Sequence, residues 1–285
     1  MTPEFVIQVS DRRLTAAGKL YDDSHNKAVS WCGHFVAGFT GFAFTDYSQK
    51  KPVSEWIGTT LAPLSSTDQA IRALQDGAEK IASQLPWPDR RLSIVLTGIA
   101  PGCDFAYFVC ISNYDDLNCI RSEAEDHFVF NQRTIPLHGD RTMYVPVGAL
   151  LNEKELTMSD ELSRIAQFGG INNAARYMVE IQRSVAARTP TVGHDAMVVA
   201  IPARPTTSFR ILTDTEGDQV NANTASYSFV KAGGFSRVRF APIWACGGWA
   251  HTSSAEGDGD NGVIRMTVLR TPTPPPATGS AVGGL

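Results

Sequence analysis

The chain has few of the residues that build a disulfide framework or a structural zinc site. Its 285 residues include five cysteines, at positions 32, 103, 110, 119 and 246, and none of them forms a Cys-x-x-Cys pair. An odd number without paired spacing argues against both kinds of site. We therefore expect reduced thiols and a cytoplasmic location. Cys32 and Cys246 also lack an identifiable base partner, so we expect both to be buried structural residues.

Long apolar runs and an excess of basic residues are also absent. No window reaches 18 consecutive apolar residues, and residues 1–9 lack the basic and apolar segments of a signal peptide. The 25 Lys and Arg residues are outnumbered by 29 Asp and Glu residues, and the net charge of −4 offers no basic field for phosphates. We expect no membrane and no nucleic-acid partner, whereas a small polar or peptide partner stays open.

Metal-binding patterns are lacking as well. The six histidines show no ligand spacing such as His-Glu-x-x-His. Residues 256–262 resemble a calcium loop but lack its twelfth-position glutamate, which favours a hydrated turn. The glycines at 169–170 have no phosphate-loop lysine after them and indicate the start of a helix. The sequence therefore predicts no metal and no cofactor.

What the chain does have is the composition of an ordinary globular protein, with 43% hydrophobic and 19% charged residues. Apolar and β-branched runs bounded by turn residues predict strands before and between the helices. These strands are expected at 4–9, 34–43, 92–100, 105–113, 128–137, 142–150 and 195–202, and a strand-like, turn-rich region runs from 204 to about 269. We expect the first two to form a tight pair, and the runs 92–100 and 105–113 to form a hairpin.

Two segments carry helical spacing. Residues 66–69, Ser-Thr-Asp-Gln, resemble a capping box, and apolar residues then recur every three or four positions until Pro86. A second helical pattern covers 152–187 and ends at the Arg-Thr-Pro-Thr-Val-Gly turn. The order strands, helix, strands, helices, strands favours an α+β fold with two stacked sheets and helices outside them over an alternating β-α-β fold.

One stretch has an order and spacing of particular interest. An apolar strand ends in Ser-Asp-Arg-Arg at 10–13, Lys27 follows Asp11 by sixteen residues, and a second strand then passes into Ala-Gly-Phe-Thr-Gly at 37–41. This pattern resembles the N-terminal nucleophile (Ntn) hydrolases of the proteasome β-subunit and HslV type. The resemblance is specific over about 40 residues and collinear to roughly residue 203.

The resemblance implies a fold, a site and a domain organisation. It implies an αββα sandwich of two mainly antiparallel sheets over residues 1–204. Beyond the matching part, the strand-like pattern predicts a strand-rich extension at 205–270 packed on this domain, and the proline and glycine bias of 271–285 predicts a disordered tail. In the family, an aspartate and a lysine flank an N-terminal threonine whose own α-amine acts as the base, and glycine N–H groups form the oxyanion hole. The residues at the matching positions are Asp11, Arg13, Lys27 and the segment from Gly38 to Gly41. The resemblance implies that Asp11, Arg13, Lys27 and Gly41 are catalytic residues or their vestiges.

The expected nucleophile is missing from this numbering. Family spacing would place it about fifteen residues before Asp11, in a first strand that this sequence does not contain. Thr2 is the early candidate, but Pro3 opposes removal of the methionine, and an extended strand would hold Thr2 on the order of 30 Å from Asp11. Supporting positions also depart from the family, with Thr189 and Val192 where it has an aspartate and a serine. The segment 147–152, Val-Gly-Ala-Leu-Leu-Asn, has no serine.

Three functional interpretations follow. The first is an inactive proteasome-like protein that serves as a scaffold or assembly subunit, self-associating through its outer helices into a homo-oligomer. The second is an active peptidase or amide hydrolase whose nucleophile lies upstream of Met1, or which uses another nucleophile. The third is an unrelated α+β binding protein, because fold alone does not decide function. Trp244, Trp249 and Phe240 in the region after 204 mark a candidate interface.

Overall fold

The computed structural model describes residues 1–16, 19–115, 121, 123–203, 226–230, 242–256 and 263–273. Within these residues it contains four helices and thirteen strands. The helices are α1 (Val53–Leu61), α2 (Thr67–Gln84), α3 (Glu153–Phe168) and α4 (Gly170–Arg188). The strands are β1 (Phe5–Asp11), β2 (Leu14–Ala16), β3 (Lys19–Asp22), β4 (Val29–Trp31), β5 (Phe35–Gly41), β6 (Leu92–Ile99), β7 (Phe105–Ser112), β8 (Val129–Pro136), β9 (Ala196–Pro202), β10 (Ser226–Val230), β11 (Ile243–Cys246), β12 (Trp249–Glu256) and β13 (Val263–Arg270).

These strands form two principal sheets and a small two-stranded one. The larger sheet has the order β13-β12-β11-β4-β5-β6-β7-β8, the second has the order β1-β9-β10, and β2 pairs with β3. Pairing is antiparallel throughout except between β11 and β4, which run parallel. The predicted α+β class with two mainly antiparallel sheets is therefore confirmed.

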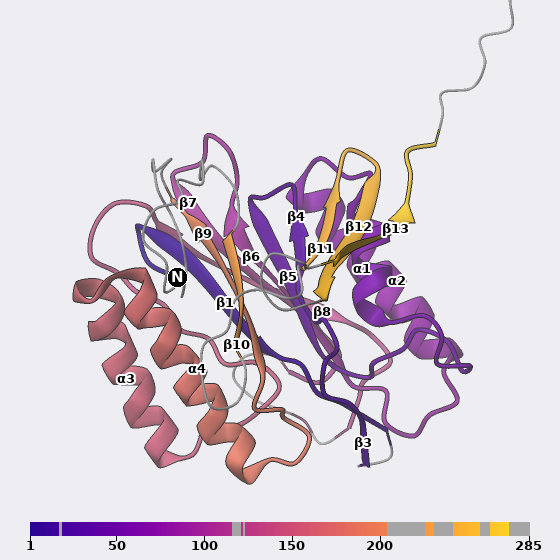
Figure 1. Ribbon diagram of the computed structural model, residues 1–285, viewed down its shortest axis with the longest axis horizontal. Coiled ribbons are helices and arrows are strands. Elements are labelled where there is room, and N and C mark those ends of the chain that lie inside the picture. Colours follow the sequence, from indigo (N-terminus) through magenta and orange to yellow (C-terminus); the bar gives the residue numbers. More distant parts are fainter. Residues whose placement is uncertain are drawn as a thin grey trace, which may run out of the picture.

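Among the described residues the core has three main parts, one at each interface of a four-layer αββα sandwich (Figure 1), and a fourth, small cluster of Leu14, Ala43 and Phe44. Alternate residues of β1 show the layering: Phe5 and Ile7 pack against α3 and α4, whereas Val6 packs against the larger sheet. This is the period of two that a strand buried on both faces requires. On the outer face of the larger sheet, α1 and α2 bury residues such as Ile57 and Leu74. Helices therefore cover both outer faces.

Capping side chains and a glycine determine where the helices begin and end. The Ser66 side chain accepts a hydrogen bond from the Gln69 N–H at 3.3 Å, which caps the first turn of α2. Asn152 and Glu155 form a reciprocal capping box at the start of α3. The helical pattern over 152–187 is two helices, and the helix start predicted at the glycines 169–170 is confirmed: Gly170 adopts a left-handed φ of 74° at the first position of α4. Helix α1 was not predicted.

Two other predictions about strands are wrong. Residues 142–150 form no strand, because Pro146 lacks an N–H and Gly148 has a φ of 84°, and both interrupt sheet pairing. Strands β1 and β5, expected to pair, lie in different sheets. The hairpin of β6 and β7 and the strands β8 and β9 are confirmed.

The cysteine prediction is also wrong. Cys32 and Cys246 form a disulfide with a Cα–Cα separation of 4.8 Å, although 214 residues separate them. Cys32 lies in the turn between β4 and β5, and Cys246 is the exposed last residue of β11. Because β11 pairs in parallel with β4, the two chain segments meet at the same end of the sheet. Neither residue is the buried thiol that we expected.

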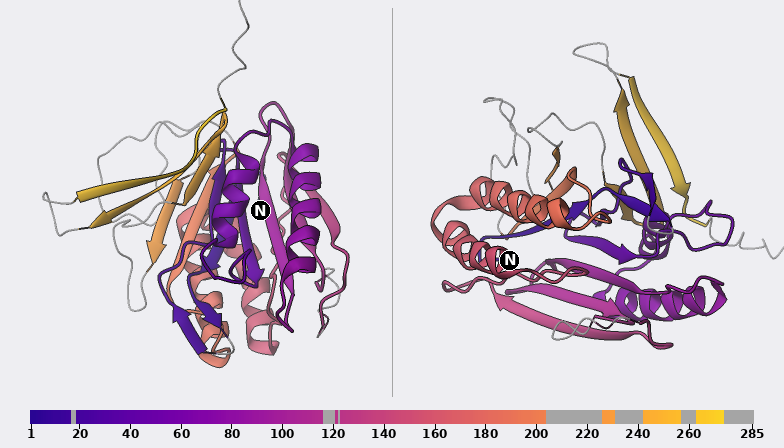
Figure 2. Two further views of the ribbon diagram at one scale, coloured as in Figure 1. Left: turned by 90° about the vertical axis from the view of Figure 1, so that its right-hand side faces the viewer. Right: turned by 90° about the horizontal axis from the view of Figure 1, so that it is seen from below.

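The described strands from the C-terminal part of the chain belong to both sheets. Strand β10 pairs with β9, and β11 to β13 extend the larger sheet beyond β4. The β12–β13 hairpin projects from the body of the molecule (Figure 2). The predicted calcium-like turn at 257–262 and Phe240 lie outside the described residues, as does the predicted tail from residue 274 onward. In the described part of the chain no helix is both long enough and apolar enough to cross a membrane.

Candidate functional site

Asp11 and Lys27 form a closely held ion pair. The Lys27 Nζ lies 3.1 Å from each of the two carboxylate oxygens of Asp11. Lys27 is 7% exposed, so its ammonium has little contact with water. An unpaired ammonium at such a place would carry a large desolvation cost, which the carboxylate offsets.

The two residues of the pair come from different sheets rather than from adjacent strands of one sheet. Asp11 is the last residue of β1, whereas Lys27 precedes β4 of the other sheet by two positions. The ion pair therefore joins the two sheets at the end of β1. The sixteen-residue spacing is bridged by the small β2–β3 hairpin, which carries the chain from one sheet to the other.

Backbone groups hold the Asp11 carboxylate in place. Its Oδ1 accepts hydrogen bonds from the N–H of Arg13 at 2.8 Å and from the N–H of Gly193 at 3.2 Å. Gly193 follows α4 and precedes β9, so this contact brings the late turn to the ion pair. A side chain at Gly193 would have its Cβ 2.9 Å from the Arg13 Cβ, which explains the glycine.

The Arg13 side chain points to another carboxylate. Its Nε and Nη2 donate to the two oxygens of Asp23 at 2.8 and 2.9 Å, and its Nη1 donates to the Pro190 carbonyl at 2.9 Å. The hydrogen bonds to Asp23 raise the pKa of Arg13 and lower the pKa of the Asp23 carboxyl. The guanidinium of Arg13 thus binds the turn after α4. Asp11 is contacted by the backbone N–H of Arg13 and not by this guanidinium.

The two glycines of the segment 38–41 have different surroundings. Gly38 lies within β5 against the side chain of Gln8, and a Cβ there would come within 2.1 Å of the Gln8 side-chain amide. Gln8 is also hydrogen-bonded to the Thr97 hydroxyl at 3.2 Å, so it connects β1 to the larger sheet. Gly41 is exposed at the end of β5 with a φ of 116°, and it does not line the cavity that contains Asp11.

Thr2 lies at the opposite end of β1 from Asp11. Its hydroxyl accepts from the N–H of Phe5 at 3.0 Å and donates to the Phe5 carbonyl at 3.2 Å. The residue is 4% exposed. The intervening strand, at about 3.3 Å per residue, keeps this hydroxyl far beyond hydrogen-bond reach of the ion pair.

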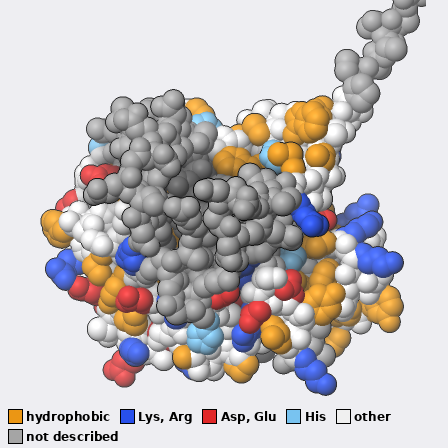
Figure 3. Space-filling model, in the orientation of Figure 1, with side chains coloured by type: hydrophobic (Ala, Val, Ile, Leu, Met, Phe, Trp, Pro, Cys, Tyr) orange, Lys and Arg blue, Asp and Glu red, His pale blue; other side chains and the backbone are white. Residues whose placement is uncertain are grey.

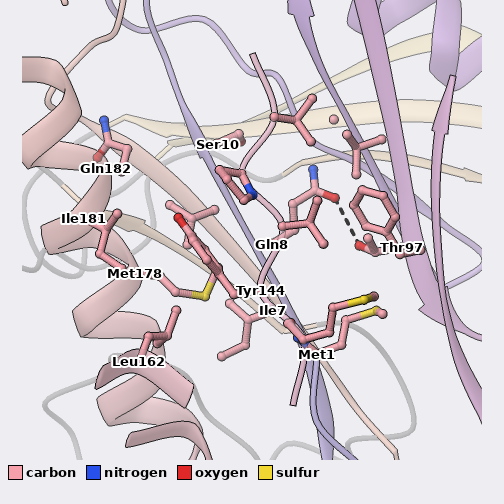
Figure 4. Close-up of a pocket in the computed structure, with 18 of the residues that line it drawn as sticks. Met1, Ile7, Gln8, Ser10, Thr97, Tyr144, Leu162, Met178, Ile181 and Gln182 are labelled. Carbon is pink, nitrogen blue, oxygen red and sulfur yellow. Dashed lines mark hydrogen bonds between the residues drawn. The ribbon is translucent and has the colours of Figure 1, made fainter. Parts of the chain in front are cut away.

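A cavity of about 230 Å³ runs along β1 between these two ends. Its lining is mainly apolar, with side chains from β1, the larger sheet, the segment 142–149 and both helices α3 and α4 (Figure 4). Two polar atoms in that lining, Ser10 Oγ and Gln182 Oε1, have no hydrogen-bond partner among the described residues. Asp11 is the one carboxylate among the described lining residues, and Lys27 neutralises it.

Sequence reasoning missed Gln8, Ser10 and Gln182. A signal for Gln182 existed: it interrupts an apolar helical face that contains Met178, Ile181 and Val185. Ser10 was visible as part of the Ser-Asp-Arg-Arg run. At the position where the Ntn hydrolases have a serine, Val192 lines the cavity with an apolar side chain. In the segment 147–152, which has no serine, the N–H of Gly148 donates to the Asp115 carboxylate at 3.4 Å.

Comparison with known proteins gives a distant structural match. No family model and no curated protein matches the chain. Among solved structures, the chain is similar to Anbu (ancestral beta-subunit) from Yersinia bercovieri, with a TM-score of 0.43 and 13% identity over 69% of this chain and 77% of that one. At this level of similarity the match carries no functional information. The four-layer arrangement stands on the packing of this chain alone.

Proposed function

We propose that this chain is a proteasome-like protein of the Ntn fold that acts as a non-catalytic scaffold or assembly subunit. The observation that carries the proposal is the separation of Thr2 from Asp11 and Lys27. An ion pair of this type assists a hydroxyl nucleophile only when the hydroxyl lies beside it. Here the hydroxyl of Thr2 is buried in its own turn at the far end of β1.

In this proposal the ion pair has a structural role. Asp11 receives two backbone N–H groups besides the ammonium of Lys27. It therefore joins β1, the start of β4 and the turn after α4. A site retained for packing needs this connection but no reacting group.

The experiment is turnover of a panel of fluorogenic peptides, with and without a covalent threonine-directed inhibitor, followed by intact mass. We expect background turnover that Lys27→Ala does not change, and no inhibitor adduct. A stoichiometric adduct on Thr2, together with turnover that Lys27→Ala abolishes, would overturn the proposal. Lys51→Ala, which alters an unburied lysine, is the control for nonspecific effects of losing a lysine.

A second candidate is an active amide hydrolase or peptidase whose nucleophile precedes Met1. The observation that favours it is the buried ion pair at one end of an apolar cavity, beside the unpartnered hydroxyl of Ser10. A longer form with a threonine, serine or cysteine about fifteen residues before Asp11 is expected to turn over substrate. Lys27→Ala should abolish that turnover, and equal activity with and without the added segment would exclude this candidate.

A further inference from the structure

The cavity follows the free edge of β1. In the described part of the chain β1 pairs with β9 alone, so its other edge has no partner strand. Consecutive residues from Ile7 to Asp11 line the cavity, although side chains of neighbouring strand residues point to opposite faces. A cavity that contacts both sets of side chains adjoins the edge of the strand rather than one of its faces.

The cavity also lies in the same layer as β1. On one side it is bounded by residues of the larger sheet, such as Val95, Thr97 and Phe108, and on the other by α3 and α4 through residues such as Met178. These are the two layers that enclose the β1-β9-β10 sheet. The empty space therefore has the position of one more strand in that sheet.

The opposite wall is an extended segment, residues 142–149, that belongs to no sheet. At one end it meets β1's leading residues through a pair of backbone hydrogen bonds, from Met143 N–H to the Met1 carbonyl at 2.9 Å and from the Met1 nitrogen to the Met143 carbonyl at 2.7 Å. Near its other end, Gly148 packs closely against Thr40 of β5. The two walls are thus joined at their ends and separated between them.

The edge of β1 leaves hydrogen-bonding groups to be satisfied. About half of the backbone N–H and C=O groups of an antiparallel edge strand point away from its partner. Among the described residues, no further backbone–backbone hydrogen bond engages residues 6–10. The buried Ser10 Oγ and Gln182 Oε1 add an unpartnered hydroxyl and an unpartnered acceptor.

We propose that the cavity binds an uncharged peptide in extended conformation, which adds to the free edge of β1 as a further strand. The backbone of such a peptide supplies alternating N–H and C=O groups to β1, and its N–H groups suit Gln182 Oε1. Its side chains alternate between the helix side, which is apolar, and the larger sheet, where Val95 and Phe108 lie beside the hydroxyls of Thr40 and Thr97. An acyl chain would fill the same volume but leave the β1 edge unpaired, which costs free energy in a buried place.

The test compares two peptides by isothermal titration calorimetry. One is an acetylated and amidated seven-residue peptide of alternating valine and threonine, and the other has the same sequence N-methylated at its five central residues. We expect saturable binding of the first and at least about tenfold weaker binding of the second, because N-methylation removes the donors that pair with a strand. Equal binding of both peptides, or no binding of the first, would overturn the proposal.

A matched pair of variants tests the location. Met178→Trp places a larger ring in the cavity, whereas Met266→Trp makes the same change at an exposed residue of β13 that does not line it. We expect about tenfold weaker peptide binding in the first variant and unchanged binding in the second. Unchanged binding in a folded Met178→Trp variant would show that the peptide binds elsewhere.

Hydrogen exchange on the unaltered protein decides the matter if Met178→Trp does not fold. The bound peptide should slow amide exchange in residues 5–11 and 142–149 and leave β13 unchanged. Exchange that stays unchanged in both segments at saturating peptide would refute strand addition. Because these readouts involve no turnover, their failure is distinct from a failure of the proposed scaffold function.

Discussion

The carboxylate of Asp11 accepts the Lys27 ammonium at 3.1 Å on both of its oxygens, and this contact spans the two sheets of the sandwich. Among the described residues the Lys27 ammonium has no acceptor besides Asp11, whereas Asp11 also accepts two backbone N–H groups. Removing Asp11 therefore leaves the Lys27 ammonium without an acceptor, whereas removing Lys27 leaves Asp11 with two hydrogen-bond donors.

The first prediction concerns this asymmetry. Asp11→Leu leaves a buried ammonium without a counter-charge and should lower the free energy of unfolding by about 3 kcal/mol, whereas Lys27→Met should cost less because backbone N–H groups still bind the carboxylate. Urea unfolding of both single variants and of the double variant measures the coupling. Arg91→Met, which breaks an exposed ion pair with Asp89, is the control and should cost under about 1 kcal/mol. A smaller cost for Asp11→Leu than for Lys27→Met would contradict the prediction.

The second prediction is a pH dependence from His25. Burial lowers its pKa from 6.5 to about 4, and its Nε2 lies 3.2 Å from the Ser54 hydroxyl. Because the unfolded chain binds this proton at a higher pH than the folded chain, stability should fall as the pH drops from about 6.5 to about 4. The loss should be on the order of 3 kcal/mol, by about 1.4 kcal/mol per pKa unit.

Urea unfolding across this pH range measures the effect, and His25→Gln should remove the part of the slope that this proton causes. His127→Gln changes an exposed histidine and should leave the slope intact. An unchanged slope in His25→Gln would show that other groups dominate acid unfolding.

The third prediction concerns the disulfide between Cys32 and Cys246. It restrains two segments that are 214 residues apart in the sequence, so removing it should lower the free energy of unfolding by about 2–4 kcal/mol. Thermal unfolding with and without reductant should show a fall in Tm for the unaltered protein and no further response in Cys32→Ser. Cys103→Ser, at a free thiol, should keep the response to reductant. A Tm that reductant leaves unchanged in the unaltered protein would argue against the bond.

The fourth prediction tests the contact between Gly38 and Gln8. Gly38→Ala places a Cβ within 2.1 Å of the Gln8 side-chain amide and should destabilise the protein by about 1–3 kcal/mol. Gln8→Ala removes the obstructing amide, so adding it to Gly38→Ala should cost less than the sum of the two single changes. Additive costs in chemical unfolding would mean that the two residues are not coupled.

The fifth prediction concerns self-association through the outer helices. Phe168 at the end of α3 is 78% exposed and Leu156 of the same helix is 53% exposed, so this helix presents more than one large apolar side chain that a second copy can cover. We expect sedimentation velocity to show an oligomer that Phe168→Ser weakens and that Met266→Ser, at an exposed residue of β13, does not. A monomer at micromolar concentration would refute this prediction. Acidic and basic side chains are interspersed along the lower edge of the face in Figure 3, so charge repulsion does not oppose such contacts there.

Much of the local structure could be predicted from the sequence alone. The apolar runs at β6, β7 and β9, and the Ser66 cap with its helical repeat, depend on interactions between near neighbours. The approach of Asp11 to Lys27 was also predictable, from spacing within a family pattern. What the sequence could not give was the sheet to which each strand belongs, because strand pairing joins segments of any separation.

Tertiary structure alone decided the features that bear most on function. The disulfide exists because β11 lies parallel to β4, and no spacing between the two cysteines predicts that neighbour relationship. The segment 142–150, expected to be a strand, forms a wall of the cavity instead, since Pro146 and Gly148 prevent regular pairing. The cavity itself arises because two helices and a wide sheet enclose a strand with one partner, and such an enclosure depends on how layers stack rather than on any local sequence.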